Sequence, residues 1–207
     1  MAQRGAGFWN LLAKRYARQP IADEESYRYK PAETRKILSD SARVLEFGCG
    51  TGSTALQHAP FVSQIDGIDF SRSMIAIAQQ KAKDAGVANV RFEIADITTY
   101  QASDPYDVVL GMNLLHLLND RRAVISKVYD ILTPGGVFVS STMCLGNGAK
   151  ILRAAVRMLS PLGVLPTVAF FSQDDLKAEM AKAGFLIEQF WCPGPGKASF
   201  VIARKPA

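Results

Sequence analysis

Histidine and cysteine, the residues that most often bind transition metals, are scarce in this chain of 207 residues. It contains two histidines and three cysteines, Cys49, Cys144 and Cys192. The cysteines lie far apart and none has a metal-ligand spacing, which argues against a zinc site and against a disulfide framework. We therefore predict no metal site and expect the cysteines to be small buried residues.

A long hydrophobic run is also missing. The uncharged, apolar stretch Met158–Gln173 is shorter than the roughly 20 residues of a membrane-spanning helix, and it contains Pro161 and Pro166. Residues 1–10 contain no apolar run of the kind found in a secretory signal. We expect a cytoplasmic protein.

Basic residues are in excess, but they form no dense stripe. The net charge is +5, and outside a cluster at Lys14, Arg15 and Arg18 the basic residues are scattered. A protein that follows a phosphate backbone needs a continuous basic surface. We therefore expect no nucleic-acid partner.

From Arg43 onward, short aliphatic segments alternate with longer segments of helical periodicity, which is typical of a parallel sheet covered by helices. The predicted strands are Arg43–Phe47, Gln64–Phe70, Val90–Ala95, Asp107–Met112, Gly136–Thr142, Leu186–Trp191 and Ser199–Ala203. The predicted helices are Thr54–His58, Ser71–Ala85, Asp120–Leu132 and Gln173–Ala183, with Ser71 and Asp174 as N-caps.

The last two predicted strands are joined by a short Pro-Gly-Pro-Gly turn at Pro193–Gly196. This turn is too short for a crossover helix, so these strands must be antiparallel. The prediction is a single α/β domain, built on a doubly wound, mostly parallel seven-stranded sheet with an antiparallel C-terminal strand.

Two segments lie outside the alternation. Residues 1–40 include an amphipathic stretch in which Phe8, Trp9 and Tyr16 lie beside basic residues. We predict that this segment is a helical lid on a domain of residues 41–207, and that the apolar, proline-interrupted insertion at 146–172 covers a substrate. The alternative for both segments is ordinary packing.

The strongest local motif is a buried strand that runs into the turn Glu46-Phe47-Gly48-Cys49-Gly50-Thr51-Gly52. Glycines are needed where the backbone turns tightly and a ligand approaches it closely. Asp69 ends the next predicted strand, about 20 residues further on, where a carboxylate can accept both hydroxyl protons of a ribose. The two features together predict a bound nucleoside.

A dinucleotide site is the natural competitor. Its fingerprint requires a glycine where this chain has Ser53. In addition, Glu46 would repel a pyrophosphate but suit a cationic ligand. Spacing and charge both favour a ligand with a sulfonium and an amino group.

These residues resemble the class I, Rossmann-like S-adenosylmethionine-dependent methyltransferases of the small-molecule type. Five motifs carry the resemblance in register between about Arg43 and Ala203. They are Glu46-x-Gly48-x-Gly50-x-Gly52, Gly67-Ile68-Asp69-Phe70-Ser71, Ala95-Asp96-Ile97, Asn113-Leu114-Leu115-His116 and Leu132-Thr133-Pro134-Gly135-Gly136.

The resemblance implies S-adenosyl-L-methionine as cofactor and a role for each motif. The three glycines would face its methionine part, and Glu46 its ammonium or sulfonium side. Asp69 would take the ribose, and Asn113 would offer its backbone carbonyl to the ammonium group. The adenine would lie between Phe70 and Ile97 with its amine on Asp96. The cofactor-binding set also includes Cys49 and Met74.

The acceptor is less well defined by the sequence. His116 is the better placed of the two histidines to act as a base, although a packing role is the competing interpretation. Tyr16 and Tyr29 are predicted, with His116, to line the substrate pocket. The stretch Gly111–His116 lacks the prolines of nucleic-acid amine methyltransferases, so a small, partly apolar molecule methylated on oxygen or nitrogen is favoured.

Two alternatives stay open from the sequence. One is a nicotinamide-dependent oxidoreductase, which Ser53 argues against. The other is a lipid-headgroup methyltransferase, whose basic and aromatic Phe8–Arg18 stretch would rest on a membrane surface. A lid helix explains that stretch without a membrane and is favoured.

Overall fold

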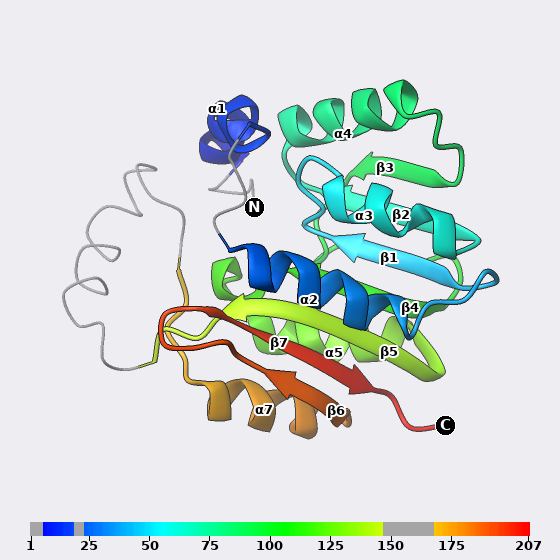
Figure 1. The fold of residues 1–207 in the computed structure, drawn as a ribbon. Helices are drawn as coiled ribbons and strands as arrows, with labels where there is room; N and C mark the ends of the chain where they lie inside the picture. Colours follow the sequence, from blue (N-terminus) through cyan, green and yellow to red (C-terminus); the bar gives the residue numbers. More distant parts are fainter. Residues whose placement is uncertain (1–5, 19–22, 147–167) are drawn as a thin grey trace.

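The computed structural model describes residues 6–18, 23–146 and 168–207 of the chain. Their strands form one sheet in the order β3-β2-β1-β4-β5-β7-β6 (Figure 1). The strands are β1 (Arg43–Phe47), β2 (Gln64–Asp69), β3 (Val90–Ile94), β4 (Tyr106–Met112), β5 (Leu132–Met143), β6 (Leu186–Trp191) and β7 (Ala198–Arg204). The seven-stranded sheet is as predicted. The predicted strand bounds lie within one residue of those observed, except that β5 begins at Leu132, four residues before the predicted Gly136.

Only β7 runs against its neighbours in this sheet. It pairs antiparallel with both β5 and β6, whereas β1 pairs parallel with β2 and β4. The predicted hairpin between the last two strands is therefore confirmed. The strand order reverses between β1 and β4, and the carboxyl ends of strands at such a point leave a crevice for ligands.

Helices cover both faces of the sheet, as the doubly wound prediction required. The helices are α1 (Ala6–Tyr16), α2 (Glu24–Arg35), α3 (Ser53–His58), α4 (Arg72–Asp84), α5 (Arg121–Ile131) and α7 (Gln173–Lys182), with short 3₁₀ turns η1 (Ala59–Phe61) and η2 (Leu115–Leu117). One core cluster contains Ile75 and Ala78 of α4, and the other contains Val124 of α5 and Leu176 of α7. No described helix combines the length and the apolar composition needed to cross a membrane.

Helix starts follow local side-chain chemistry. The hydroxyl of Ser71 accepts the Met74 N–H, so Ser71 is the predicted N-cap of α4. The prediction of Asp174 as N-cap of α7 is wrong. Ser172 caps that helix, because its hydroxyl accepts the Asp175 N–H while the Asp175 carboxylate accepts the Ser172 N–H.

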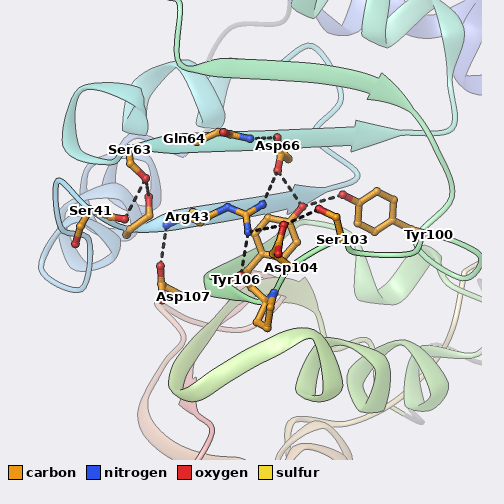
Figure 2. Close-up of polar contacts among 12 residues, drawn as sticks. Ser41, Arg43, Ser63, Gln64, Asp66, Tyr100, Ser103, Asp104, Tyr106 and Asp107 are labelled. Atoms are coloured by element: carbon orange, nitrogen blue, oxygen red, sulfur yellow. Dashed lines mark hydrogen bonds and ion pairs between the residues drawn. The ribbon is translucent and has the colours of Figure 1, made fainter.

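The amino ends of the strands are tied together by a polar network (Figure 2). The Arg43 guanidinium lies 3.8 Å from Asp66 and stacks over the Tyr106 ring at 5.1 Å. Tyr106 donates to Asp66 at 2.9 Å and shares a hydrogen bond with Tyr100 at 2.8 Å. This network joins β1, β2 and β4 at the amino ends of the strands, opposite the crevice.

The two segments outside the alternation are placed only in part. Helix α1 lies beside α4 (Figure 1), where the Asn10 side chain accepts hydrogen bonds from Ser71 Oγ at 2.7 Å and Ser73 N at 3.1 Å. Most of the insertion predicted at 146–172 lies outside the described residues. Its two ends meet, because the Gly146 N–H donates to the Phe171 carbonyl at 2.8 Å.

Candidate cofactor site

A cavity of about 370 Å³ lies at the carboxyl ends of β1, β2 and β4. This is within the usual size range of small-molecule sites. Ten residues predicted for the cofactor line it, together with Tyr16: Glu46, Gly48, Cys49, Gly50, Asp69, Phe70, Met74, Asp96, Ile97 and Asn113. Residues far apart in the sequence are thus brought together as the motifs predicted.

The glycine turn forms the floor of the cavity. Gly48, Gly50 and Gly52 have φ values of +64°, +54° and +75°. A Cβ on Gly50 would meet nothing nearer than the Tyr16 ring at 4.0 Å, so this glycine leaves open space for a ligand. Gly50 is therefore the position at which a ligand can approach the backbone closely.

Gly52 has a different role from the one predicted. A Cβ there would lie 2.6 Å from the Phe92 ring and 2.9 Å from the Ala78 side chain, and Gly52 does not line the cavity. The expectation that all three glycines face the ligand needs correction, because Gly52 permits close packing of the turn against β3 and α4.

Glu46 places a buried carboxylate beside the turn. Its side chain is 2 % exposed, and Oε2 has no hydrogen-bond partner among the described residues. Burial raises the pKa of Glu46 to about 8, against smaller lowering effects of the Ala55 N–H and the Thr54 side chain. A buried carboxyl oxygen without a partner is costly. This orphaned oxygen suits a ligand with a positive charge or N–H donors.

Asp69 braces the same turn from the end of β2. Its Oδ2 accepts the Gly50 N–H at 3.0 Å, and its Oδ1 accepts the Ser71 N–H at 2.8 Å. Burial raises the pKa of Asp69, while both backbone N–H groups lower it. Each carboxylate oxygen still has a lone pair for a ligand hydroxyl.

The next part of the cavity is apolar with one acid at its edge. Phe70, Met74 and Ile97 line it, and the Asp96 carboxylate accepts the Thr98 N–H at 2.9 Å. A flat aromatic ligand fits such a slot, because its faces contact apolar side chains and its edge meets a carboxylate. This is the arrangement that the resemblance implies for an adenine.

Asn113 follows β4 in an unusual backbone conformation. Its φ of +55° is the only positive value for a non-glycine residue in the described chain. Its N–H donates to the Ser141 carbonyl at 2.7 Å, and its Oδ1 accepts from Ser141 Oγ at 3.1 Å. Asn tolerates the left-handed region better than most residues, and these bonds fix how Asn113 enters the cavity.

His116 lies in η2 and is not among the cavity-lining residues. Its Nδ1 accepts the Met143 N–H at 3.4 Å and lies 3.1 Å from the Thr142 hydroxyl. Burial lowers its pKa to about 4. A neutral ring whose Nδ1 accepts has its proton on Nε2. In this geometry Nε2 is a hydrogen-bond donor and not a base. The predicted base role of His116 therefore has no support from these contacts and stays a prediction.

The two tyrosines predicted to line the substrate pocket lie in different parts of the structure. Tyr16 of α1 lines the cavity, and burial and the charges of Glu46 and Asp69 raise its pKa. Tyr29 does not reach the cavity. It stacks on Trp191 with ring centroids 4.2 Å apart, and its hydroxyl accepts from Gln189 at 2.7 Å. Tyr29 is therefore placed as a packing residue between α2 and β6.

Some cavity residues were not predicted. Trp9 and Thr54 line it, as do Leu117 and Leu118. Trp9 belongs to the aromatic stretch that the sequence predicts as a lid. The leucines follow the fourth-strand motif, but a leucine run gives no sign of which side chains face a ligand.

The comparisons with known proteins agree with this geometry. Residues 38–200 match the family model of the methyltransferase domain. The chain belongs to the methyltransferase domain family. The family is the one predicted from the five motifs, and its match disfavours the nicotinamide alternative.

Several proteins named methyltransferases resemble the chain in sequence. A malonyl-[acyl-carrier protein] O-methyltransferase of Bacillus cytotoxicus is 33% identical over 64% of this chain and 49% of that protein. A demethylmenaquinone methyltransferase of Leptospira interrogans is 33% identical over 65% of this chain and 60% of that protein. The chain thus spans about half the length of the curated relatives it matches.

Solved structures confirm the fold of the methyltransferase domain. The YcgJ protein of Bacillus subtilis has a TM-score of 0.71 at 19% identity, covering 87% of this chain and 99% of that chain. The [4+2]-cyclase SpnF has a TM-score of 0.80 at 19% identity, covering 98% of this chain and 95% of that chain. Their class I, Rossmann-like fold is that of S-adenosylmethionine-dependent methyltransferases.

Proposed function

We propose that this protein transfers the methyl group of S-adenosyl-L-methionine to oxygen or nitrogen of a small, partly apolar molecule. The observation that carries the proposal is the orphaned Oε2 of Glu46 beside the open glycine Gly50. A cationic amino-acid moiety lying over Gly50 would satisfy that oxygen. Family membership supports the same cofactor.

Each part of the cofactor has residues to receive it. Glu46 and the backbone carbonyl of Asn113 would hold the charged methionine end, and Asp69 would accept from the ribose hydroxyls. Phe70 and Ile97 would enclose the adenine, with its amine on Asp96. All these residues line the same cavity.

When bound, the cofactor supplies a methyl group on a sulfonium, which any well-placed lone pair can displace. The chain then has to orient the acceptor and exclude water. Trp9 and Tyr16 of α1, with Leu114, Leu117 and Leu118, provide apolar walls for this purpose. These walls support an acceptor that is at least partly apolar.

The names of the relatives suggest where to look for the acceptor. One relative is named for malonyl-[acyl-carrier protein] and another for demethylmenaquinone. The lipid-headgroup alternative stays a weaker proposal, because the aromatic side of α1 is engaged at the cavity through Trp9 and Tyr16. The same fold occurs in a protein named a cyclase, so methyl transfer has to be measured directly.

The test is transfer of a tritiated methyl group from S-adenosylmethionine to malonyl-[acyl-carrier protein], to demethylmenaquinone and to a mixed extract of small molecules. Label in any acceptor fraction, lost in Asp69→Ala, supports the proposal. A protein that reduces or oxidises substrates with a nicotinamide cofactor and transfers no label would contradict it.

A further inference from the structure

A buried lysine that the cofactor assignment does not use lies next to the site. Lys30 of α2 is 8% exposed, although it carries an ammonium group. Its Nζ donates to Ser141 Oγ on β5 at 2.8 Å, and no carboxylate pairs with it among the described residues. Burial lowers the pKa of Lys30. Burying a lysine is costly. We therefore ask what its hydrogen bond to Ser141 does for the neighbouring site.

The chemistry of an ammonium gives the contact a direction. Nζ has donors only, so the Ser141 oxygen must accept from it. The Ser141 hydroxyl proton is then directed onward, and the acceptor within reach is Asn113 Oδ1 at 3.1 Å. Lys30 thus favours the orientation of the Asn113 amide in which its oxygen accepts the Ser141 hydroxyl proton.

The consequence appears at the cavity. With Oδ1 engaged on Ser141, the Asn113 amide has its NH₂ group left for a ligand, and Asn113 lines the cavity at the end of β4. An amide NH₂ donates hydrogen bonds and cannot accept them. It can therefore bind a methyl-acceptor molecule through a carboxylate, phenol or carbonyl oxygen. It cannot accept a hydrogen bond from the N–H group of an amine.

We propose that Lys30 is a positioning residue which, through Ser141, holds the Asn113 amide as a hydrogen-bond donor for an oxygen-bearing acceptor. The proposal rests on the function proposed above for the choice of acceptor. The orientation of the amide does not depend on it and is measurable without cofactor. The two ideas can therefore fail separately.

The first measurement is the side-chain NH₂ spectrum of ¹⁵N-asparagine-labelled protein, with and without the Lys30→Met change. We expect the Asn113 NH₂ pair to shift or broaden. Without the Lys30 ammonium group, the Ser141 hydroxyl can either donate a hydrogen bond to the Asn113 amide or accept one from it. The Asn89 pair, which donates to the Ala59 and Val62 carbonyls, is the internal control and should stay in place. Lys36→Met removes the exposed lysine at the C-cap of the same helix and should change neither pair.

A second variant protects the test against a folding defect in Lys30→Met. Ser141→Ala removes the middle of the relay and should move the Asn113 NH₂ pair in the same way. The double variant should add no further change. An Asn113 pair that stays at its parent position in a folded Lys30→Met or Ser141→Ala protein would overturn the proposal.

The acceptor class is tested on protein loaded with S-adenosylhomocysteine, using 2-naphthol and 2-naphthylamine as probes of one carbon skeleton. We expect only the naphthol to move the Asn113 NH₂ pair, with its affinity lowered about fivefold in Lys30→Met, the range of one hydrogen bond. No movement with naphthol, or equal movement with both, would overturn the oxygen assignment. Failure to bind S-adenosylhomocysteine would instead count against the proposed function.

Discussion

The Asp69 carboxylate accepts the backbone N–H of Gly50 at 3.0 Å, so the end of β2 holds the turn that follows β1. The residue proposed to take the ribose therefore also shapes the floor on which the ligand lies. If Asp69 takes the ribose as proposed, ligand binding and the geometry of the turn are coupled through one side chain.

Asp69→Ala should weaken binding of S-adenosylhomocysteine by more than about tenfold, because it removes acceptors for the ribose and for two backbone N–H groups. Isothermal titration measures the loss. Glu93→Ala, a change at an exposed acid on β3, should bind like the parent. Parent-like affinity in Asp69→Ala would contradict the ribose assignment.

Glu46 makes the stability of the ligand-free protein depend on pH. Its pKa is raised by burial to about 8, so the folded ligand-free protein binds a proton that the unfolded chain releases near its ordinary value. The contribution of Glu46 to stability is therefore largest at low pH and falls as the pH rises toward 8.

The ammonium group of S-adenosylhomocysteine favours the charged carboxylate, so affinity for this ligand should rise between pH 6 and pH 8. Glu46→Gln should bind more weakly at pH 8 and show a flatter profile. Titrations across this range in both proteins provide the comparison. An equally steep rise in the Gln variant would assign the pH dependence to another group.

Gly50 and Gly52 should respond differently to alanine. Gly52→Ala places a Cβ 2.6 Å from the Phe92 ring and should lower the free energy of unfolding by about 1–3 kcal/mol, as overpacking does. Gly50→Ala has open space and should lose ligand affinity with a smaller loss of stability, arising from its positive φ. Denaturant melts and titrations of both variants separate the two effects, and equal stability losses would contradict the assignment.

Asn10 should act as the contact that keeps α1 over the cavity. Asn10→Ala removes the acceptor for Ser71 Oγ and Ser73 N. We expect S-adenosylhomocysteine to dissociate several times faster, because Trp9 and Tyr16 cover the cavity from the same helix. Leu11→Ala, at a side chain 84% exposed on α1, is the matched control. Equal dissociation rates in the two variants would contradict the lid.

Much of the fold could be predicted from the sequence because its signals are local. The alternation of strands and helices, the Pro193–Gly196 turn and Ser71 as a cap each depend on neighbouring residues. The sequence predicts Asp174 as the cap of α7, but serine caps helices as readily as aspartate does, and Ser172 is the observed cap. The choice depends on the reciprocal bonds between Ser172 and Asp175.

Most of the predicted motif residues that line the cavity could be placed together for the same reason, since their motifs end parallel strands. The remaining features depend on long-range packing. In the sequence Gly52 cannot be distinguished from Gly50. The difference arises in the folded chain, where Phe92 of β3 lies against Gly52. Tyr29 and Lys30 are adjacent in α2, and only the tertiary structure directs one to Trp191 and the other to Ser141.

The network at the amino ends of the strands should affect stability without affecting the site. Tyr106→Phe removes the hydroxyl that donates to Asp66 and contacts Tyr100 (Figure 2). We expect a loss of about 1–2 kcal/mol, or a Tm lower by roughly 2–8 °C. Affinity for S-adenosylhomocysteine should not change, and a large change would show that the two ends of the sheet are coupled.

The most direct test of the central claim is a thermal melt of the parent protein with S-adenosylhomocysteine and, in parallel, with reduced nicotinamide cofactor. At about 100 times its dissociation constant a ligand stabilises the folded state by about 2.7 kcal/mol, which raises the Tm of a chain this size by roughly 5–10 °C. The account predicts this rise with S-adenosylhomocysteine alone. A rise only with the nicotinamide compound would contradict it, and so would no rise with either.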